Sequence, residues 1–416
     1  MLDLKLLRGD PDTVRAALAR RGEDGGLDRV LALDERRRAI LPELEALRGE
    51  QNAANDAIAA AKREGSGAED AIARMREVAG RAKALAEELA TVDGELQDVL
   101  ARLPNLPDPG SPDADTVVRE VGTAPTLAAP RDHLELAGSM IDMEHAARLS
   151  GSRFAYLRGD LVFLELALVR WTLELLRGHG FEPVIPPVLV REEALYGTGF
   201  LPDTEQQIYA LPEDELYLVG TSEVALASLH AGEILDPGDL PLRYAGFSPC
   251  FRREAGAAGR DTRGIFRVHQ FDKVEMFSFV EPSASKEEHE RLLSIEEEIL
   301  QTLGLSYRVV DIAIGDLGNS AARKFDCEAW IPSQEKFREL TSTSNTTDYQ
   351  ARRLEIRWRP PGGGRPETLH TLNGTAVAVG RTMIALLENG QRDDGTVVLP
   401  EALVAYGAPA SLAAAS

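Results

Sequence analysis

The sequence predicts an α+β protein in two parts: a long antiparallel helical hairpin, then a domain built on an antiparallel β-sheet flanked by helices. Three observations predict this. Apolar residues recur at alternating steps of three and four through residues 27–103, six prolines fall within residues 104–130, and short runs beyond them alternate apolar with polar residues. We therefore expect an N-terminal domain at 1–104 and a second domain at 105–416.

The hairpin is predicted by a seven-residue repeat. One apolar seam runs from Val30 to Ile58 and a second from Met75 to Leu103, separated by a short Gly-Ser-Gly turn at 65–67. Such repeats place one apolar stripe on each helix, so the two helices can pair. A helix of roughly 35 residues reaches about 50 Å at 1.5 Å per residue.

The charge of the whole chain and the charge of residues 57–84 point to different uses of this hairpin. With 46 basic and 68 acidic residues the net charge is −22 and the pI about 4.8, which argues against bulk electrostatic binding of nucleic acid. Residues 57–84 reverse the sign, with six basic side chains against four acidic ones. The basic ones are Lys62, Arg63, Arg74, Arg76, Arg81 and Lys83. The hairpin is therefore either a spacer or oligomerisation element, the commoner use of a coiled coil, or a nucleic-acid reader.

Other protein classes are disfavoured by what the sequence lacks. No run of about 18 apolar residues predicts a membrane span, and the N-terminus does not read as a secretory signal. Cys250 and Cys327 form neither a disulfide framework nor a CxxC pair, and the seven histidines form no metal-like cluster. We expect a cytoplasmic protein with no zinc site and no membrane partner.

The second domain begins with mixed elements. Phe154–Arg177 has the apolar period of a helix, and an extended stretch at 181–187 follows two glycines. Residues 266–280 alternate as a strand, and 287–303 predict another helix. Strands that alternate in this way favour an antiparallel sheet with helices against it.

The alternating strand carries candidate chemistry. A two-residue period places Arg267, His269, Phe271, Lys273 and Glu275 on one face. On this face the Phe271 ring and the Glu275 carboxylate would lie about 13 Å apart at 3.3 Å per residue. That spacing suits a ligand with an aromatic base at one end and a cation at the other. The alternative is a half-exposed strand with a cross-strand ion pair, and the histidine is expected to be a hydrogen-bonded structural residue.

A last motif precedes the C-terminal helix. Thr375 is a candidate N-cap and Gly390 a candidate residue just past the helix end. Arg381 would then lie in the early turns, close to backbone N–H groups that favour anions. Its alternative is a solvated helix residue.

Taken together, these residues resemble the three motifs of class II aminoacyl-tRNA synthetases, in order. The motifs are the stretch leading to Pro187, Phe251-Arg252-Arg253-Glu254, and Gly380-Arg381. Longer strings resemble bacterial-type seryl-tRNA synthetases, and the likeness extends over essentially the whole chain. These strings are Thr221-Ser222-Glu223, residues 259–264, 269–275, 343–345, 348–353 and 371–374.

The resemblance implies a class II catalytic domain behind a tRNA-binding arm. The implied enzyme is a serine–tRNA ligase that joins L-serine and ATP into seryl-adenylate. It then passes serine to the 3′ end of tRNA(Ser) and, where the host has one, of tRNA(Sec). The resemblance also implies Mg²⁺ with the ATP, and a homodimer in which each arm reaches across to the other subunit. The basic residues around the tip would then grip the tRNA.

The resemblance also assigns residues to ATP. Arg252 would bridge the serine carboxylate and the α-phosphate, Glu254 would accept a hydrogen bond from the adenine amino group, and Phe271 would stack on the base. Arg267 and Arg381 would contact the γ-phosphate side. The remaining positions implied for ATP are Arg253, Val274, Glu339, Leu340, Thr341 and Ser342, with Glu339 and Ser342 also implied for the metal.

For serine, the resemblance implies Thr221, Ser222, Glu223, Arg252, Glu275, Asn373 and Thr375. Glu275 would pair with the α-ammonium, and Thr375 would meet the substrate hydroxyl. Glu275, Arg252 and Arg381 are the three implied catalytic residues.

Two other functions stay open from the sequence. One is a paralogue that makes seryl-adenylate for a non-tRNA acceptor, although such a relative would be expected to lose the hairpin or its basic tip. The other is a non-enzymatic coiled-coil scaffold with an inactive synthetase fold, which the intact motif residues disfavour.

Overall fold

The computed structural model describes every residue except 24, 65–68, 203–206, 256–260, 262 and 416. It divides into two compact units, Leu2–Pro104 and Asn105–Ser416, the second of which also includes Met1.

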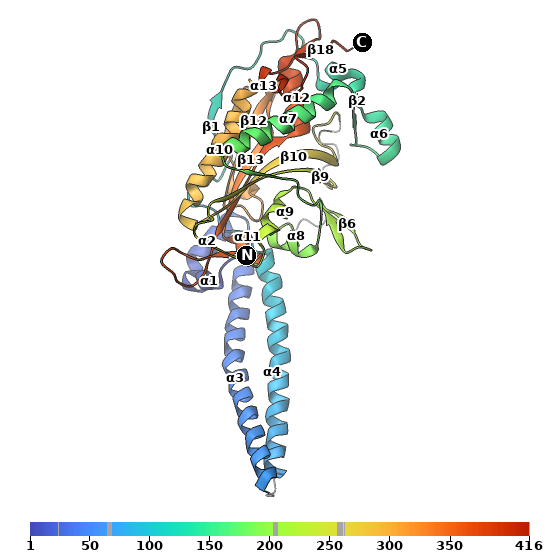
Figure 1. Cartoon of the computed structure of the whole chain (residues 1–416). Coiled ribbons are helices and arrows are strands. Elements are labelled where there is room, and N and C mark those ends of the chain that lie inside the picture. The colour runs from blue at the N-terminus through green and yellow to red at the C-terminus, as the bar shows by residue number, and fades with distance from the viewer. Residues whose placement is uncertain (24, 65–68, 203–206, 256–260, 262, 416) are drawn as a thin grey trace. The chain divides into compact units, whose positions relative to one another are not determined.

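The N-terminal unit is all helical. Its helices are α1 (Leu4–Gly9), α2 (Pro11–Arg20), α3 (Gly26–Glu64) and α4 (Glu69–Arg102). Asp10 caps α2 by accepting a hydrogen bond from the backbone N–H of Thr13 at 3.2 Å, and Pro11 occupies the first helical position, where no N–H is needed. Helices α3 and α4 pack side by side along their length (Figure 1).

The predicted seams hold the hairpin together. Ile40, Leu44 and Leu47 of α3 are buried, as are Ala82 and Leu96 of α4. The prediction of a helical arm is therefore confirmed. Helix α3 continues through Pro42, and the predicted turn at 65–67 lies outside the described residues.

Ion pairs run along the outside of the hairpin and join the two helices. They are Arg29–Glu95, Arg36–Glu88, Arg37–Asp93 and Arg81–Glu43. All eight side chains are more than a third exposed, and exposed pairs contribute about 0.2–1 kcal/mol each. The apolar seam, not these pairs, therefore stabilises the arm.

The C-terminal unit is organised by an eight-stranded sheet in the order β1-β11-β12-β13-β16-β10-β9-β4. Its strands are β1 (Thr116–Val121), β4 (Glu182–Val184), β9 (Leu242–Phe251), β10 (Gln270–Val280), β11 (Tyr307–Asp311), β12 (Arg323–Ile331), β13 (Lys336–Thr347) and β16 (His370–Ala378). Neighbours pair antiparallel except β4 and β9, which are parallel. The predicted sheet is confirmed, with one parallel edge pair that the alternation pattern did not predict.

Smaller sheets and the helices surround this sheet. The short strands are β2 (Ile141–Asp142), β3 (Tyr156–Leu157), β5 (Leu189–Val190), β6 (Tyr209–Leu211), β7 (Leu216–Leu218), β8 (Ile234–Leu235), β14 (Arg357–Trp358), β15 (Glu367–Thr368), β17 (Val397–Val398) and β18 (Ser411–Leu412). The helices are α5 (His133–Ala137), α6 (Met143–Ser150), α7 (Asp160–Gly178), α8 (Glu192–Thr198), α9 (Glu223–Ala227), α10 (Ser285–Thr302), α11 (Tyr349–Arg353), α12 (Val379–Gly390) and α13 (Glu401–Val404).

The main core lies between the central sheet and helices α7, α10 and α12 (Figure 1). Leu168, Ile295 and Leu387 of these helices are buried with Val274 and Leu372 of the strands. This packing fixes the strands whose other side chains form the site described below.

Two predicted boundaries are wrong. The helix expected from Phe154 begins at Asp160, because residues 156–157 pair as β3 and Gly159 takes a left-handed φ of 59° before the helix. The strand expected from Phe266 begins at Gln270, so Arg267 and His269 precede it.

The capping prediction for the last helix is also wrong. Thr375 lies inside β16, paired with Glu275 of β10, and the helix begins at Val379. Gly390 is the last residue of α12 and does not follow it. The ladder with β10 holds this stretch extended, so the helix begins three residues later than a cap at Thr375 would place it.

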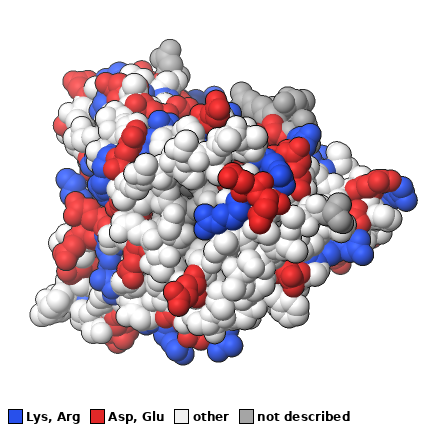
Figure 2. Space-filling model, turned by 90° about the horizontal axis from the view of Figure 1, so that it is seen from above, with Lys and Arg blue, Asp and Glu red and all other residues white. Residues whose placement is uncertain are grey.

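Among the residues that the structure describes, no helix is both long enough and apolar enough to span a membrane. On the face of the molecule in Figure 2, acidic and basic side chains are interspersed around a largely uncharged centre.

Candidate active site

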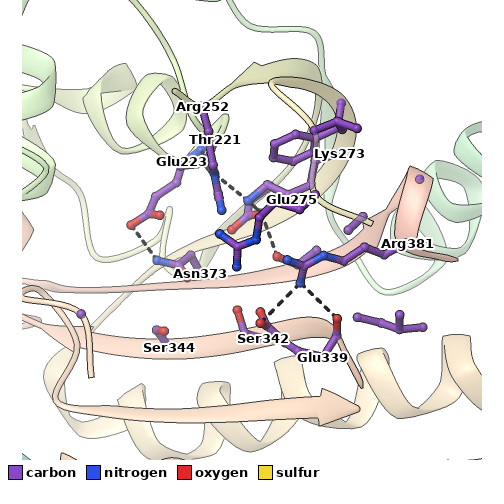
Figure 3. A pocket seen from close by; sticks show the side chains of 18 of the residues that line it. Thr221, Glu223, Arg252, Lys273, Glu275, Glu339, Ser342, Ser344, Asn373 and Arg381 are labelled. Carbon is purple, nitrogen blue, oxygen red and sulfur yellow. Dashed lines mark hydrogen bonds and ion pairs between the residues drawn. The ribbon is translucent and has the colours of Figure 1, made fainter. Parts of the chain in front are cut away.

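One cavity of about 350 Å³ collects most of the predicted site residues (Figure 3). It is lined by the ends of β9 and β10, by β13 and β16, by the start of α12 and by the segment before α9. The predicted residues that line it are Thr221, Glu223, Arg252, Glu254, Arg267, Phe271, Glu275, Glu339, Leu340, Ser342, Asn373, Thr375 and Arg381.

Four predicted residues do not line the cavity. Val274 is fully buried in the main core, because alternation along β10 turns it away from Phe271 and Glu275. Ser222 is buried, with its hydroxyl 3.4 Å from the Gly246 carbonyl. Arg253 is exposed. Thr341 points to the opposite face of β13, where its hydroxyl donates to Glu296. A side-chain contact with a ligand in this cavity is thus not supported for these four.

Arg252 lies at the end of β9, held by its neighbours. Its Nε donates to the Gly220 carbonyl at 3.1 Å, and its guanidinium lies 5.3 Å from the centre of the Phe271 ring. The Arg252 carbonyl is 2.9 Å from Nδ1 of His269, so this histidine has the structural role predicted for it. The guanidinium and the aromatic face are therefore presented to the cavity together.

Glu254 and Arg267, which both line the cavity, form an ion pair with each other. Glu254 takes a left-handed φ of 50°, which a non-glycine residue rarely adopts. Such conformations persist where the surrounding structure determines them, often at ligand sites. Both side chains line the cavity and can therefore contact a ligand bound in it.

A second group of polar side chains in the cavity is buried. The Nζ of Lys273 donates to the Thr221 hydroxyl at 2.7 Å and forms an ion pair with Glu275. The hydroxyl of Thr375 is 3.4 Å from the same Glu275 carboxylate. Lys273 and Glu275 are each less than a tenth exposed, so their attraction is weakly screened by water.

Glu223 closes this end of the cavity. Its Oε1 accepts a hydrogen bond from Asn373 Nδ2 at 2.7 Å (Figure 3). It also accepts one from Gln350 Nε2 at 2.8 Å. Burial and the neighbouring Glu275 carboxylate raise the pKa of Glu223 to about 7. This carboxyl therefore changes charge near neutral pH.

The opposite end of the cavity is rich in cations. Arg381 donates to the Glu339 carbonyl at 3.0 Å and lies 3.4 Å from its carboxylate. Burial opposes ionisation of Glu339, but Arg381 and Lys324 outweigh it and hold its pKa below the usual value. Lys324 in turn lies 3.0 Å from Asp326, whose pKa burial raises to about 7.

Behind the sheet, Glu296 of α10 supports the strand that carries Glu339 and Ser342. Its carboxyl accepts a hydrogen bond from the Thr341 hydroxyl at 2.9 Å, and complete burial raises its pKa well above the ordinary value. A neutral carboxyl can be buried here without a cationic partner. A Cβ built on Gly374 would lie 2.9 Å from Glu296 Oε1, so glycine lets the strand approach this side chain.

The described residues contain no group of three or more His, Cys, Asp and Glu side chains placed to hold a metal ion. Glu339 and Ser342 both offer oxygen to the cavity, which suits a hard cation that takes its remaining ligands from phosphate and water. The donor set therefore fits a metal that arrives with a nucleotide.

The cavity contains charges of both signs. Arg267 pairs with Glu254 and Arg381 with Glu339, while Glu275 pairs with Lys273. Arg252 lies between these groups, since its charge favours the ionised forms of both Glu223 and Glu339. Such an arrangement can hold a polyanion and an ammonium group side by side, with an aromatic ring for a base.

Comparisons with known proteins identify the family to which a chain with this cavity belongs. Residues 1–107 match the family described as the seryl-tRNA synthetase N-terminal domain, and residues 208–390 match the tRNA synthetase class II core domain (G, H, P, S and T). The chain is 53% identical over 414 residues to a serine–tRNA ligase of Acidothermus cellulolyticus, covering 98% of each chain. The chain belongs to the seryl-tRNA synthetase family.

Other members of the seryl-tRNA synthetase family agree. The serine–tRNA ligase of Streptomyces coelicolor is 52% identical, covering 98% of this chain and 97% of that one. The crystal structure of the Pyrococcus horikoshii seryl-tRNA synthetase with ATP superposes with a TM-score of 0.93 at 41% identity, covering all of both chains. The family and the class II fold predicted from the motifs are confirmed, and serine–tRNA ligation, the predicted activity, is the activity of this family.

Sequence reasoning missed several cavity residues of this seryl-tRNA synthetase. Lys273 lies on the predicted strand face, but the sequence did not assign it a role. Its position between Phe271 and Glu275 on that face could have indicated that it lines the cavity. Lys324 lies on β12, outside every recognised motif, and Phe266 lies between Ile265 and Arg267, where no period identified it.

The predicted basic residues of the arm lie at different distances from its tip, with Arg81 and Lys83 more than three turns into α4. Arg63 lies one residue before the end of α3, and the other residues, on α4, are Arg74, Arg76, Arg81 and Lys83. All five are exposed, although Arg81 also pairs with Glu43. Lys62 belongs to α3, but its side chain lies outside the described residues.

Proposed function

We propose that this chain uses the cavity to make seryl-adenylate from L-serine and ATP and then to pass serine to the 3′ end of tRNA(Ser). The observation that carries the proposal is a single cavity lined by three arginines, an aromatic ring and two buried glutamates. No side-chain nucleophile is required, because the serine carboxylate attacks the α-phosphorus and pyrophosphate leaves. Positioning and charge neutralisation then supply the rate enhancement.

Serine binds at the acidic end in this proposal. Glu275 accepts the α-ammonium, which takes over from Lys273 as its cationic partner. Thr375 and the Glu223–Asn373 pair face the substrate hydroxyl. An analogue without that hydroxyl would leave buried polar groups unpaired, which disfavours alanine strongly. Support comes from the short contacts among these groups in the structure.

ATP binds at the cationic end. Phe271 stacks on the adenine, and Arg252 bridges the serine carboxylate and the α-phosphate with its planar guanidinium. Glu254 accepts from the adenine amino group, while Arg267 and Arg381 contact the outer phosphates. Because Glu254 and Arg267 pair with each other in the structure, nucleotide binding would exchange that ion pair for ligand contacts.

Mg²⁺ is the metal we propose with the nucleotide, held by Glu339 and Ser342. When bound it would neutralise phosphate charge and favour departure of pyrophosphate. The lowered pKa of Glu339 keeps its carboxylate ionised for this purpose.

We propose that residues 1–104 form a tRNA-binding domain and 105–416 the catalytic domain. The exposed basic side chains near the arm tip support binding of tRNA(Ser), and of tRNA(Sec) where present, through phosphates and RNA shape. Association as a homodimer is supported by α7, which exposes Val162, Phe163 and Leu166. In that homodimer we expect each arm to serve the other subunit. The expected location is the cytoplasm, where tRNA is charged.

Two assays in sequence test the proposal. Serine-dependent exchange of pyrophosphate into ATP should occur without tRNA, and serylation of tRNA(Ser) should follow when tRNA is added. Exchange without serylation would instead support the paralogue that serves another acceptor. Absence of exchange with active relatives run in parallel would exclude both enzymes and leave the inactive scaffold.

A further inference from the structure

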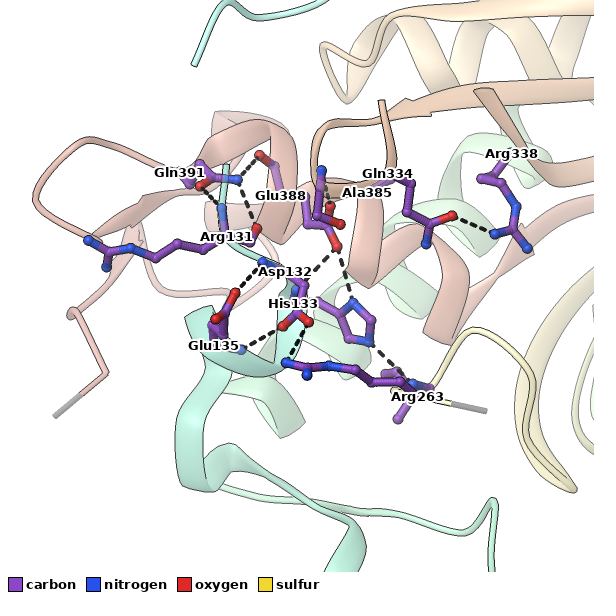
Figure 4. A network of polar contacts seen from close by, with 12 residues as sticks. Arg131, Asp132, His133, Glu135, Arg263, Gln334, Arg338, Ala385, Glu388 and Gln391 are labelled. Atoms are coloured by element: carbon purple, nitrogen blue, oxygen red, sulfur yellow. Dashed lines mark hydrogen bonds and ion pairs between the residues drawn. The ribbon is translucent and has the colours of Figure 1, made fainter. Parts of the chain in front are cut away.

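A buried polar network lies beside the cavity and outside every predicted site (Figure 4). It joins α5, the last turns of α12 and the segment from Gly264 to Arg267. His133 and Glu388 form its centre, and each is less than a twentieth exposed. A buried histidine–carboxylate pair needs a reason, since burying these groups is costly unless they are fully hydrogen-bonded.

The contacts fix the arrangement of both side chains. One carboxylate oxygen of Glu388 accepts from the backbone N–H and from Nδ1 of His133, both at 3.1 Å. The other oxygen accepts from the Ser333 backbone N–H at 3.0 Å. On the far side of the ring, Nε2 accepts from the Ile265 backbone N–H at 3.3 Å. These partners require the tautomer with its proton on Nδ1.

The chain passes the histidine ring very closely. Gly264 has a φ of +79°, and a Cβ built on it would lie 2.0 Å from His133 Nε2. Any other residue at 264 would be strained and would displace either the ring or the chain. Gly264 therefore allows the hydrogen bond from the next residue, Ile265.

The segment held in this way leads directly into the nucleotide end of the cavity. Two guanidinium groups make cation–π contacts with the Phe266 ring: that of Arg338 lies 3.9 Å and that of Arg381 4.9 Å from the ring centre. The next residue, Arg267, forms the ion pair with Glu254. Ile265, Phe266 and Arg267 all line the cavity, so a shift at the hydrogen bond to His133 would move them together.

We infer that His133 and Glu388 are positioning residues for the nucleotide subsite, acting through the Ile265 backbone N–H. The pair ties the segment that carries Phe266 and Arg267 to α12, the helix that carries Arg381. Two of the three guanidinium groups at the cationic end thus depend on one buried pair for their spacing. This inference rests on the proposed function, because it takes that end of the cavity as the ATP subsite.

The inference predicts a split between the two substrates. The serine end is fixed by other contacts, those among Lys273, Thr221 and Glu275 and those of Glu223. None of these involves His133 or Glu388. Loosening the network should therefore raise the KM for ATP and leave the KM for serine unchanged, whereas a general folding defect would affect both.

A matched pair of amide variants tests this. In His133→Gln the side-chain oxygen can reach the position of Nε2 and accept from Ile265. In His133→Asn the amide can reach only the position of Nδ1 and donate to Glu388. We expect the KM for ATP in pyrophosphate exchange to rise about tenfold in His133→Asn, the cost of one lost hydrogen bond, and less than about threefold in His133→Gln. The KM for serine should stay within about twofold in both. Equal effects of the two variants on ATP, or a parallel rise for serine, would overturn the inference.

A glycine pair provides an independent test if the histidine variants fold poorly. Gly264→Ala should raise the KM for ATP about tenfold, because the new methyl group displaces the ring. Gly232→Ala is the control, since Gly232 has a φ of +78° but nothing within 4 Å of the new Cβ. Equal ATP constants for the two alanine variants would refute the proposed link.

Failure of the proposed function is distinguishable from failure of this inference. Titration of wild type and variants with ATP alone, followed by calorimetry, measures the nucleotide subsite without any requirement for serine activation. Weaker ATP binding in His133→Asn than in His133→Gln would support the inference even in a protein that showed no exchange. Equal binding would contradict it whether or not exchange occurred.

Discussion

The helical arm and the catalytic cavity use charge in opposite ways. On the arm, Arg36–Glu88 and similar pairs lie on the surface, while a buried apolar seam holds the helices. In the cavity, Lys273 and Glu275 are buried against each other and Glu223 titrates near neutral pH. Water screens the first kind of charge and not the second. Each surface pair is thus individually replaceable, whereas the cavity depends on single side chains.

The largest effect should come from the cavity. Arg252→Ala removes the guanidinium proposed to bridge serine and the α-phosphate, and we expect pyrophosphate exchange to fall by at least about a thousandfold. Circular dichroism should show an unchanged fold, because the main core does not contain this side chain. Arg36→Ala on the arm is the matched control and should retain exchange. Substantial exchange by Arg252→Ala would remove this residue from the proposed chemistry.

The next effect should separate the two regions completely. Replacing residues 57–84 by a short turn should leave exchange within about twofold and lower kcat/KM for tRNA(Ser) charging by about a hundredfold or more. A full-length variant with Arg74, Arg76 and Lys83 changed to Ala should show a smaller loss that shrinks as salt is raised. Charging that survives the deletion would show that the arm tip does not bind the tRNA.

A moderate effect should follow the titration of Glu223. Its pKa is raised to about 7, so the carboxyl is neutral in acid and becomes charged as the pH rises through that value. The ionised form adds negative charge beside Glu275, the proposed partner of the substrate ammonium, so the KM for serine should fall several-fold between about pH 6 and pH 8. Glu223→Gln cannot titrate and should show a flat profile. The same slope in both proteins would assign the pH dependence to another group.

The smallest effect should be on the arm surface. Glu88→Ala breaks the exposed pair with Arg36, and the free energy of unfolding should fall by about 0.5 kcal/mol or less, as measured by urea denaturation. Leu44→Ala, in the buried seam, is the comparison and should cost about 2–5 kcal/mol. A loss for Glu88→Ala that approached that of Leu44→Ala would contradict the view that the seam stabilises the hairpin.

The arm was predictable in more detail than the cavity. Its seam depends on spacing alone, so Ile40, Leu44 and Leu47 could be read as buried from the heptad pattern. The cavity residues came mainly from motif resemblance, which identified Arg252 and Glu275 but missed Lys324. That lysine lines the cavity because β12 pairs with the next strand, β13, and Lys324 lies opposite Ser344 in this pairing, a register that no motif around Lys324 indicates.

The errors have the same cause. Thr375 looked like a helix cap because a threonine before a helical stretch commonly is one, yet pairing with β10 keeps it in a strand. Val274 shares a motif with Glu275, but the alternation of side chains sends it into the core. His133 and Glu388 are far apart in sequence, and only the folded chain brings them to Ile265.

The close approach of Gly374 to Glu296 has an evolutionary consequence. A Cβ at 374 would lie 2.9 Å from the buried Glu296 carboxyl, so position 374 cannot gain a side chain unless Glu296 moves or is replaced. We expect substitutions at 374 among relatives to be accompanied by a smaller residue at 296. Redesign of the serine end of the cavity at Thr375, the residue next to Gly374, would have to consider positions 296 and 374 together.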